Sequence, residues 1–160
     1  SGVPLKDLRS RINVIYAGAN DIAKSDYDQA FVLARIEDMV ANLRAVCPRF
    51  VILGLTNGWG NLPVSQGGTR ADDATSKQFM DQIAALNAAL KARYGELYFD
   101  THAKVVASNP SYSASYVVGV KTYQVLTATV ISDGIHYTTT GKSTIANARI
   151  SFITDKGWFQ

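Results

Sequence analysis

Three short runs of apolar residues stand out in this chain, and none of them alternates between apolar and polar positions. They cover residues 13–17, 50–55 and 97–100. A strand that is buried on both faces, as in a parallel sheet covered by helices, has this nearly continuous apolar pattern. We therefore predict three strands of a parallel sheet.

Helical patterns lie between and after these runs. Apolar residues recur three and four positions apart over about residues 28–46, 76–94 and 139–156, which predicts one apolar stripe on each helix. Asp28 lies near the predicted start of the first helix, where negative charge suits the helix dipole. This order predicts an α/β fold, a three-layer sandwich whose mainly parallel sheet is flanked by helices. Since three strands make a narrow sheet for 160 residues, either loop regions add strands or the sheet is incomplete in this chain.

Two segments do not follow the helix or buried-strand pattern. Residues 57–73 contain several glycines and a proline and read as a long loop. Residues 104–131 are rich in Ser, Tyr, Val and Thr, so we predict a β-rich insertion with a hairpin formed by 115–120 and 123–130. Residues 1–160 as a whole read as a single domain or a domain fragment.

Composition narrows the classes of function. Hydrophobic residues make up 47% and charged residues 18%, as in a folded domain. The net charge of +3 is spread along the chain without a basic cluster, so we expect no nucleic-acid partner. No apolar run approaches the roughly 20 residues of a membrane span, so we expect no membrane partner either. Two histidines and the single Cys47, which we expect to be buried, do not assemble a metal site, and no metal or cofactor is predicted.

Polar residues follow the predicted strands. Gly18, Asn20 and Asp21 come after the first strand, and His102 comes shortly after the third. The carboxyl ends of parallel strands share one edge of the sheet, where ligands bind in open α/β folds. Turns need such residues as well, and His102 is more readily a structural histidine than a residue of the cleft.

The run Asp133-Gly134-Ile135-His136 carries a stronger signal. An aspartate three positions before a histidine can fold back through the glycine turn and accept a hydrogen bond from the imidazole N–H. This contact fixes the tautomer and supports the imidazolium, which is the orienting role of the acid in a hydrolytic triad. An exposed turn with an incidental histidine is the alternative, and the residues alone leave both open.

Several blocks of the sequence together resemble the SGNH (GDSL-type) hydrolases. Gly18-Ala19-Asn20-Asp21, after an apolar strand, looks like that family's Gly-x-Asn-Asp block. Ser132 to Tyr137, followed by Gly141 and the apolar run 145–148, looks like its terminal Asp-x-x-His block and closing helix. Order and distances fit over roughly residues 12–157, and the resemblance implies a flavodoxin-like three-layer fold.

The resemblance also implies roles for four residues. His136 would be the general base that deprotonates a serine, and Asp133 would orient it. The side-chain amide of Asn20 and the turn at Gly18 would stabilise the oxyanion, and preorganised donors of this kind contribute roughly 2.7–4 kcal/mol each.

One block of the family is missing from this sequence. The nucleophilic serine belongs to a Gly-Asp-Ser block upstream of Gly-x-Asn-Asp, and no Gly-Asp-Ser occurs here. Gly2 is the only upstream residue that could be the second oxyanion glycine, although Ser1-Gly2 equally reads as a cloning remnant. We expect the chain to be the C-terminal part of a longer protein that supplies the serine, and to have little activity alone. A degenerate, non-catalytic relative is the other explanation.

Two functions follow from this interpretation. The first is a serine esterase or deacetylase acting on small acyl esters, with acylated carbohydrate suggested by the loop aromatics Trp59, Tyr112, Tyr116 and Tyr123, whose alternative is packing. The second is a non-catalytic carbohydrate- or receptor-binding domain, for example the C-terminal end of a phage tail fibre or spike. An extracellular or virion-associated location would fit, and homo-oligomer formation stays open.

Overall fold

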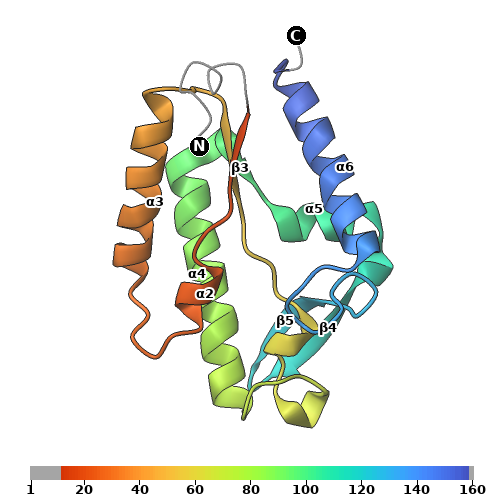
Figure 1. The fold of residues 1–160 in the computed structure, drawn as a ribbon. Coiled ribbons are helices and arrows are strands. Elements are labelled where there is room, and N and C mark those ends of the chain that lie inside the picture. Colours follow the sequence, from red (N-terminus) through yellow and green to blue (C-terminus); the bar gives the residue numbers. More distant parts are fainter. Residues whose placement is uncertain (1–11, 159–160) are drawn as a thin grey trace, which may run out of the picture.

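A small parallel sheet lies between two layers of helices (Figure 1). The computed structural model describes residues 12–158. Its sheet contains β1 (Asn13–Ile15), β2 (Phe50–Leu53) and β3 (Tyr98–Phe99), in that spatial order and all parallel. The three strands lie within the apolar runs, and the three-layer α/β prediction is confirmed.

Two long helices cover one face of the sheet. They are α3 (Gln29–Arg44) and α4 (Asp73–Tyr94), and their apolar stripes pack on Phe50 and Ile52 of β2. Asp28 caps α3, because its carboxylate accepts a hydrogen bond from the Ala30 N–H at 2.8 Å. Capping satisfies a backbone donor that has no partner inside the helix, which is why the helix begins there.

The long helix α6 (Thr139–Asp155) covers the opposite face. Ile153 of this helix packs on Val51 and Leu53, the β2 residues that alternate with those facing α3 and α4. The strand is thus buried on both faces, which explains its uninterrupted apolar sequence. Thr138 caps α6 by accepting a hydrogen bond from the Gly141 N–H at 3.0 Å.

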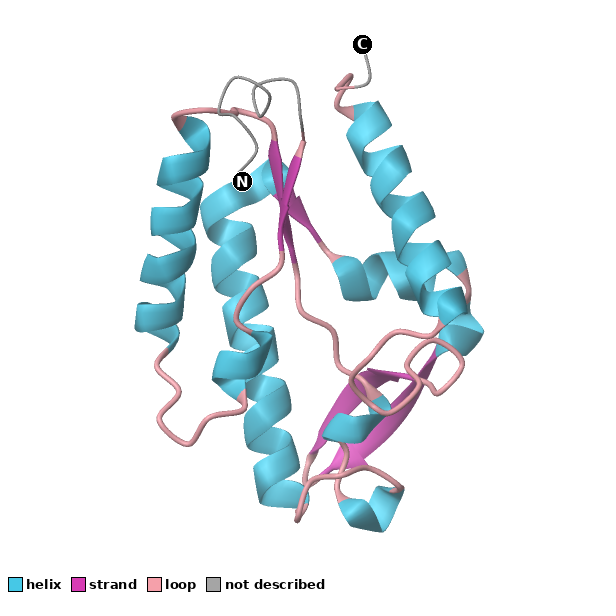
Figure 2. Ribbon diagram, in the orientation of Figure 1, coloured by secondary structure: helices cyan, strands magenta, loops and turns pink. Residues whose placement is uncertain are grey.

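The segment predicted to be β-rich from residue 104 begins instead inside a helix, α5 (Thr101–Ser108), as Figure 2 shows. The Asp100 carboxylate caps it by accepting from the Ala103 N–H at 3.0 Å. Val105 is fully buried against residues that include Ile145 of α6. This packing overrides the β-propensity of the valines, on which the prediction depended.

The predicted hairpin is present with shifted bounds. It consists of β4 (Ser113–Val118) and β5 (Lys121–Leu126), which pair antiparallel. The remaining short elements are helix α2 and four 3₁₀ turns: α2 (Ala19–Ile22), η1 (Trp59–Asn61), η2 (Val64–Gln66), η3 (Gly95–Leu97) and η4 (Pro110–Tyr112). Both η1 and η2 lie within the loop predicted after the second strand.

Candidate active site

Gly18 turns the chain from the end of β1 into the short helix α2. Its φ is +96°, a conformation that side chains disfavour. A Cβ at this position would lie 2.9 Å from Leu86 Cδ2 and 3.3 Å from Val32 Cγ1, so a larger residue would force these two buried side chains to shift. The turn places Asn20 on α2, and its amide makes no hydrogen bond to any described residue.

The Asp133–His136 turn folds back on itself as its sequence predicts. Asp133 Oδ1 accepts from the backbone N–H groups of His136 at 2.7 Å and Ile135 at 3.1 Å. Asp133 Oδ2 lies 2.7 Å from His136 Nδ1. Gly134, with φ of +85°, allows the tight turn between them. The carboxylate therefore fixes both the loop and the ring.

These contacts also set the charge state of the acid. The backbone N–H of His136, followed by its ring and the N–H of Ile135, holds the pKa of the Asp133 carboxyl well below its usual range. With Nδ1 donating to this carboxylate, a neutral ring carries its lone pair on Nε2. The His136 side chain is 78% exposed, so Nε2 is accessible to a reacting group.

Three glycines bring this turn against the loop that follows β2. A Cβ on Gly134 would lie 2.4 Å from the Gly60 Cα, and a Cβ on Gly58 would lie 2.5 Å from the Gly134 carbonyl oxygen. The Trp59 Nε1–H donates to the Ile131 carbonyl at 2.9 Å and ties the same two segments together. The turn that bears Asp133 and His136, which form a hydrogen-bonded dyad, is therefore held in place by close backbone packing.

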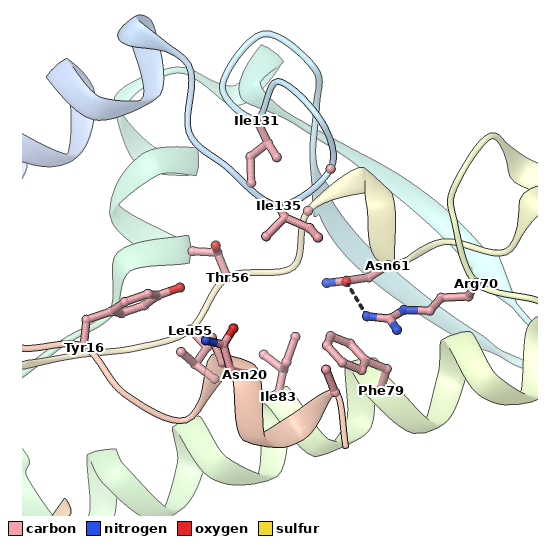
Figure 3. A pocket seen from close by; sticks show the side chains of 14 residues that line it. Tyr16, Asn20, Leu55, Thr56, Asn61, Arg70, Phe79, Ile83, Ile131 and Ile135 are labelled. Atoms are coloured by element: carbon pink, nitrogen blue, oxygen red, sulfur yellow. Dashed lines mark hydrogen bonds between the residues drawn. The ribbon is translucent and has the colours of Figure 1, made fainter. Parts of the chain in front are cut away.

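A cavity of about 120 Å³ opens between α2, α4 and these two loops (Figure 3). Asn20 lines it from α2, and Gly134 and Ile135 line it from the dyad turn. His136 is not among the lining residues, but it directly follows Ile135. The next residue, Tyr137, hydrogen-bonds through its hydroxyl to Thr56 Oγ1 at 2.6 Å, and Thr56 also lines the cavity. The structure thus brings Asn20 and the turn that bears His136 to one cavity.

A family model described as "GDSL-like Lipase/Acylhydrolase family" matches residues 2–142, which is most of this chain. The chain belongs to the GDSL-like lipase/acylhydrolase family. The match confirms the resemblance drawn from the sequence, and it includes both the Asn20 segment and the Asp133–His136 turn of this acylhydrolase domain. No curated protein matches the chain.

Gly2 and His102 do not join the cavity. Gly2 lies outside the described residues. His102 lies in the first turn of α5 and does not line the cavity, and burial lowers its pKa because the charged imidazolium is disfavoured there. This position matches the expectation of a structural histidine.

The four aromatic residues considered for sugar stacking pack against buried apolar clusters, and only Tyr123 among them is itself buried. Tyr123 is only 6% exposed, and Tyr116 and Tyr112 contact buried apolar clusters of the hairpin and of α6. Trp59 contacts both clusters. Trp59, Tyr112 and Tyr116 are only partly buried, so sugar stacking by these residues stays a prediction.

Sequence reasoning missed several residues of the cavity. Arg70 and Asn61 come from the loop after β2, Phe79 and Ile83 come from α4, and Tyr16 follows β1. A long loop at the carboxyl edge of the sheet indicates that the loop lines a site. The sequence does not indicate which residues of this loop point into the cavity.

Within residues 12–158, no group of three or more His, Cys, Asp or Glu side chains is arranged to hold a metal ion. None of the helices described is long and apolar enough to span a membrane. Cys47 is fully buried, as expected.

Proposed function

We propose that this domain hydrolyses small acyl esters by a serine mechanism, with His136 as general base and Asp133 as its orienting acid. The 2.7 Å contact between Asp133 Oδ2 and His136 Nδ1, in a turn that borders a cavity lined by Asn20, is the observation that carries the proposal. A carboxylate and an imidazole in this arrangement would supply the acid–base half of a hydrolytic site.

The proposed chemistry runs in two steps. As the serine Oγ attacks the ester carbonyl, its proton passes to His136 Nε2, and Asp133 stabilises the imidazolium. The proton then passes to the departing alkoxide, which leaves as the alcohol. Water, deprotonated by the same nitrogen, attacks the acyl-serine, and the proton returns to the serine as the acid is released. The uncommitted amide of Asn20 and the backbone turn at Gly18 would donate to the oxyanion.

The nucleophile of this proposal comes from sequence upstream in a longer parent protein. No Gly-Asp-Ser occurs in the chain. Among the described residues no serine hydroxyl bonds to the His136 ring, and Ser132 Oγ donates instead to the His136 backbone carbonyl at 3.1 Å. Among the described residues, β1 pairs only with β2, and its residue Val14 is 43% exposed. An unpaired edge with exposed apolar side chains is where a further strand would add.

The substrate in this proposal is an acyl ester with no sugar portion specified. The aromatic residues that suggested carbohydrate do not line the cavity, and each packs against a buried apolar cluster, so the proposal does not extend to a sugar.

The test is p-nitrophenyl acetate hydrolysis by the longer parent protein. We expect His136→Ala to lower kcat by at least about 10³-fold, because the base and its orienting acid act as one unit with the serine. His102→Gln is the matched control, since it changes the only other histidine and leaves the cavity intact. Unchanged turnover in His136→Ala would exclude this residue as the base.

The chain itself gives a second arm of the same experiment. We expect the 160-residue chain to show no turnover above that of its His136→Ala variant. Turnover equal to that of the parent would mean that a serine within the chain is the nucleophile. In the parent, Asn20→Ala should lower kcat by about 10²- to 10³-fold if its amide stabilises the oxyanion.

A further inference from the structure

Arg70 places a positive charge in the cavity that contains Asn20. Its side chain lines this cavity together with Asn61 and Phe79, as Figure 3 shows. The guanidinium carbon lies 3.7 Å from the centre of the Phe79 ring, and Nη2 donates to Asn61 Oδ1 at 3.4 Å. Stacking and hydrogen bonding hold the plane of the guanidinium in one orientation.

No acid neutralises this charge within the described part of the chain. Arg70 forms no ion pair with a described residue, and neither Asp nor Glu is among the residues that line the cavity. Asp72, two residues further along, is committed to capping α4 by accepting from the Thr75 N–H at 2.8 Å. The nearest acid in the sequence therefore has another structural role.

Most of the donors on the guanidinium are unused. Arginine has five N–H donors, and the bond to Asn61 uses one of them. Arg70 Nε is buried and has no hydrogen-bond partner among the described residues. The donors left for a ligand are therefore those of the two Nη atoms, which carry four N–H groups and use one of them on Asn61.

The backbone around Arg70 is also fixed. Its N–H donates to the Leu62 carbonyl at 3.0 Å, and its carbonyl accepts from the Val64 N–H at 2.9 Å. The loop is therefore closed on itself. Because the backbone and the ring stack are both in place, little further ordering is needed when an anion binds.

We propose that the cavity binds an ester that also carries a carboxylate, and that Arg70 is the residue that recognises this carboxylate. A planar guanidinium with free donors on one edge matches a carboxylate, which accepts two parallel hydrogen bonds. The apolar residues that share the cavity, including Leu55, Ile83 and Ile135, suit the short hydrocarbon between the carboxylate and the ester. The ester in this assignment rests on the proposed esterase function, whereas the carboxylate rests on Arg70 alone.

The test is equilibrium binding to the 160-residue chain, measured by titration calorimetry. Monomethyl glutarate carries the carboxylate on the acyl side of the ester, and acetoxyacetate carries it on the alcohol side. Their neutral counterparts are dimethyl glutarate and methyl acetoxyacetate. We expect at least one acid to bind about tenfold more tightly than its neutral counterpart, with a preference that shrinks as salt is added. The pair that shows the preference identifies which side of the ester carries the anion.

Variants then assign the preference to Arg70. Arg70→Gln should abolish it, and Arg70→Lys should reduce it, because lysine keeps the charge and loses the planar fork. Arg35→Gln is the matched control, since Arg35 lies on α3 with a side chain that is 67% exposed and outside the cavity. Circular dichroism checks that each variant is folded. If Arg70→Gln does not fold, Arg70→Lys and the wild-type comparison of acid with diester decide the question.

Equal binding of acid and diester in both pairs would overturn the assignment, as would a folded Arg70→Gln variant that keeps the preference. The binding measurement needs no nucleophile, so it separates the two proposals. A parent protein without esterase activity would overturn the proposed function and leave an Arg70-dependent preference standing. Normal hydrolysis of p-nitrophenyl acetate without any preference for the acid would overturn only the role of Arg70.

Discussion

At the scale of single residues, the Asp133–His136 turn is built from contacts between near neighbours. Asp133 accepts hydrogen bonds from two backbone N–H groups and lies within hydrogen-bond distance of the His136 ring. All of these hydrogen bonds stabilise the carboxylate, and its protonation would break or weaken them. The acid should therefore stay ionised, and the ring oriented, well below neutral pH.

The first prediction concerns the titration of Asp133. Its pKa is depressed in the folded chain, so its contribution to stability is present above the unfolded value of about 3.9 and is lost as pH falls through the folded value. An NMR titration of the Asp133 side-chain carboxyl carbon should give a midpoint clearly below that of the same residue in the urea-unfolded chain. Equal midpoints would mean that the three hydrogen bonds do not hold the carboxylate in solution.

The second prediction concerns the glycine that precedes Asn20. Gly18→Ala combines a disfavoured positive φ with a close contact to Leu86, whereas Gly67→Ala has a positive φ of +81° and no atom within 4 Å of its new Cβ. We expect Gly67→Ala to cost about 1–2 kcal/mol of unfolding free energy, and Gly18→Ala to cost about 1–3 kcal/mol more. Urea unfolding of both variants measures the difference. Equal costs would show that the loop moves away from Leu86 without penalty.

At the scale of elements, the hairpin is joined to α4 by apolar packing on Met80 and by polar contacts to one carboxylate. Asp81 on α4 accepts from the Tyr123 hydroxyl at 2.9 Å and from Lys77 at 2.6 Å, and it also contacts Lys121. The two lysines hold the pKa of Asp81 well below its usual range, and burial together with the hydrogen bond to Asp81 raises the pKa of Tyr123 to about 12. This cluster fixes the hairpin beside the helix that lines the cavity.

The third prediction removes this charge. Asp81→Asn should lower the free energy of unfolding by about 1–2 kcal/mol, because a partly buried hydroxyl and two lysines lose a charged acceptor. Asp38→Asn is the control, since Asp38 is 70% exposed and has only a 3.9 Å ion pair with Arg35, and it should cost at most about 0.5 kcal/mol. Chemical denaturation of both variants at pH 7 gives the comparison, and indistinguishable values would mean that the cluster does not hold the hairpin.

At the scale of the whole molecule, the two faces of the sheet are covered unequally. Both α3 and α4 pack on one face, while α6 covers the other (Figure 1). Ile36 on α3 is 1% exposed, whereas Ile153 on α6 is 8% exposed. The α6 side also adjoins the unpaired edge of β1 in the described residues, where Val14 is exposed and lines a groove with Ile145 and Arg149.

The fourth prediction follows from this asymmetry. We expect Ile36→Ala to cost about 4 kcal/mol and Ile153→Ala about 2 kcal/mol, since a less enclosed site relaxes more around the lost methyl groups. Ile150→Ala, at a position of α6 that is 53% exposed, is the control and should cost at most about 0.5 kcal/mol. If a longer parent protein, as proposed above, supplies a strand at the edge of β1, the cost of Ile153→Ala should be higher in that protein. Equal costs for Ile36→Ala and Ile153→Ala in the 160-residue chain would contradict the asymmetry.

The sequence by itself determined the features that depend on near neighbours. The strand of residues 50–53 follows from its uninterrupted apolar run. The start of α3 near Asp28 and the fold of the Asp133–His136 turn follow from interactions within a few residues. The family assignment also followed from short blocks in the right order. Interactions between residues a few positions apart depend on the local sequence, so these features can be predicted without knowing the fold.

Only the tertiary structure decided how distant segments meet. Ile135 lines the same cavity as Asn20, and glycines 58, 60 and 134 let its turn pack against the loop after β2, a contact that no periodicity reveals. Arg70 belongs to that cavity because a closed loop and the Phe79 ring orient it. The helix at 101–108 formed for the same reason, since burial of Val105 against α6 outweighed its preference for a strand. Packing between segments far apart in the chain determines the site, and a single sequence does not record it.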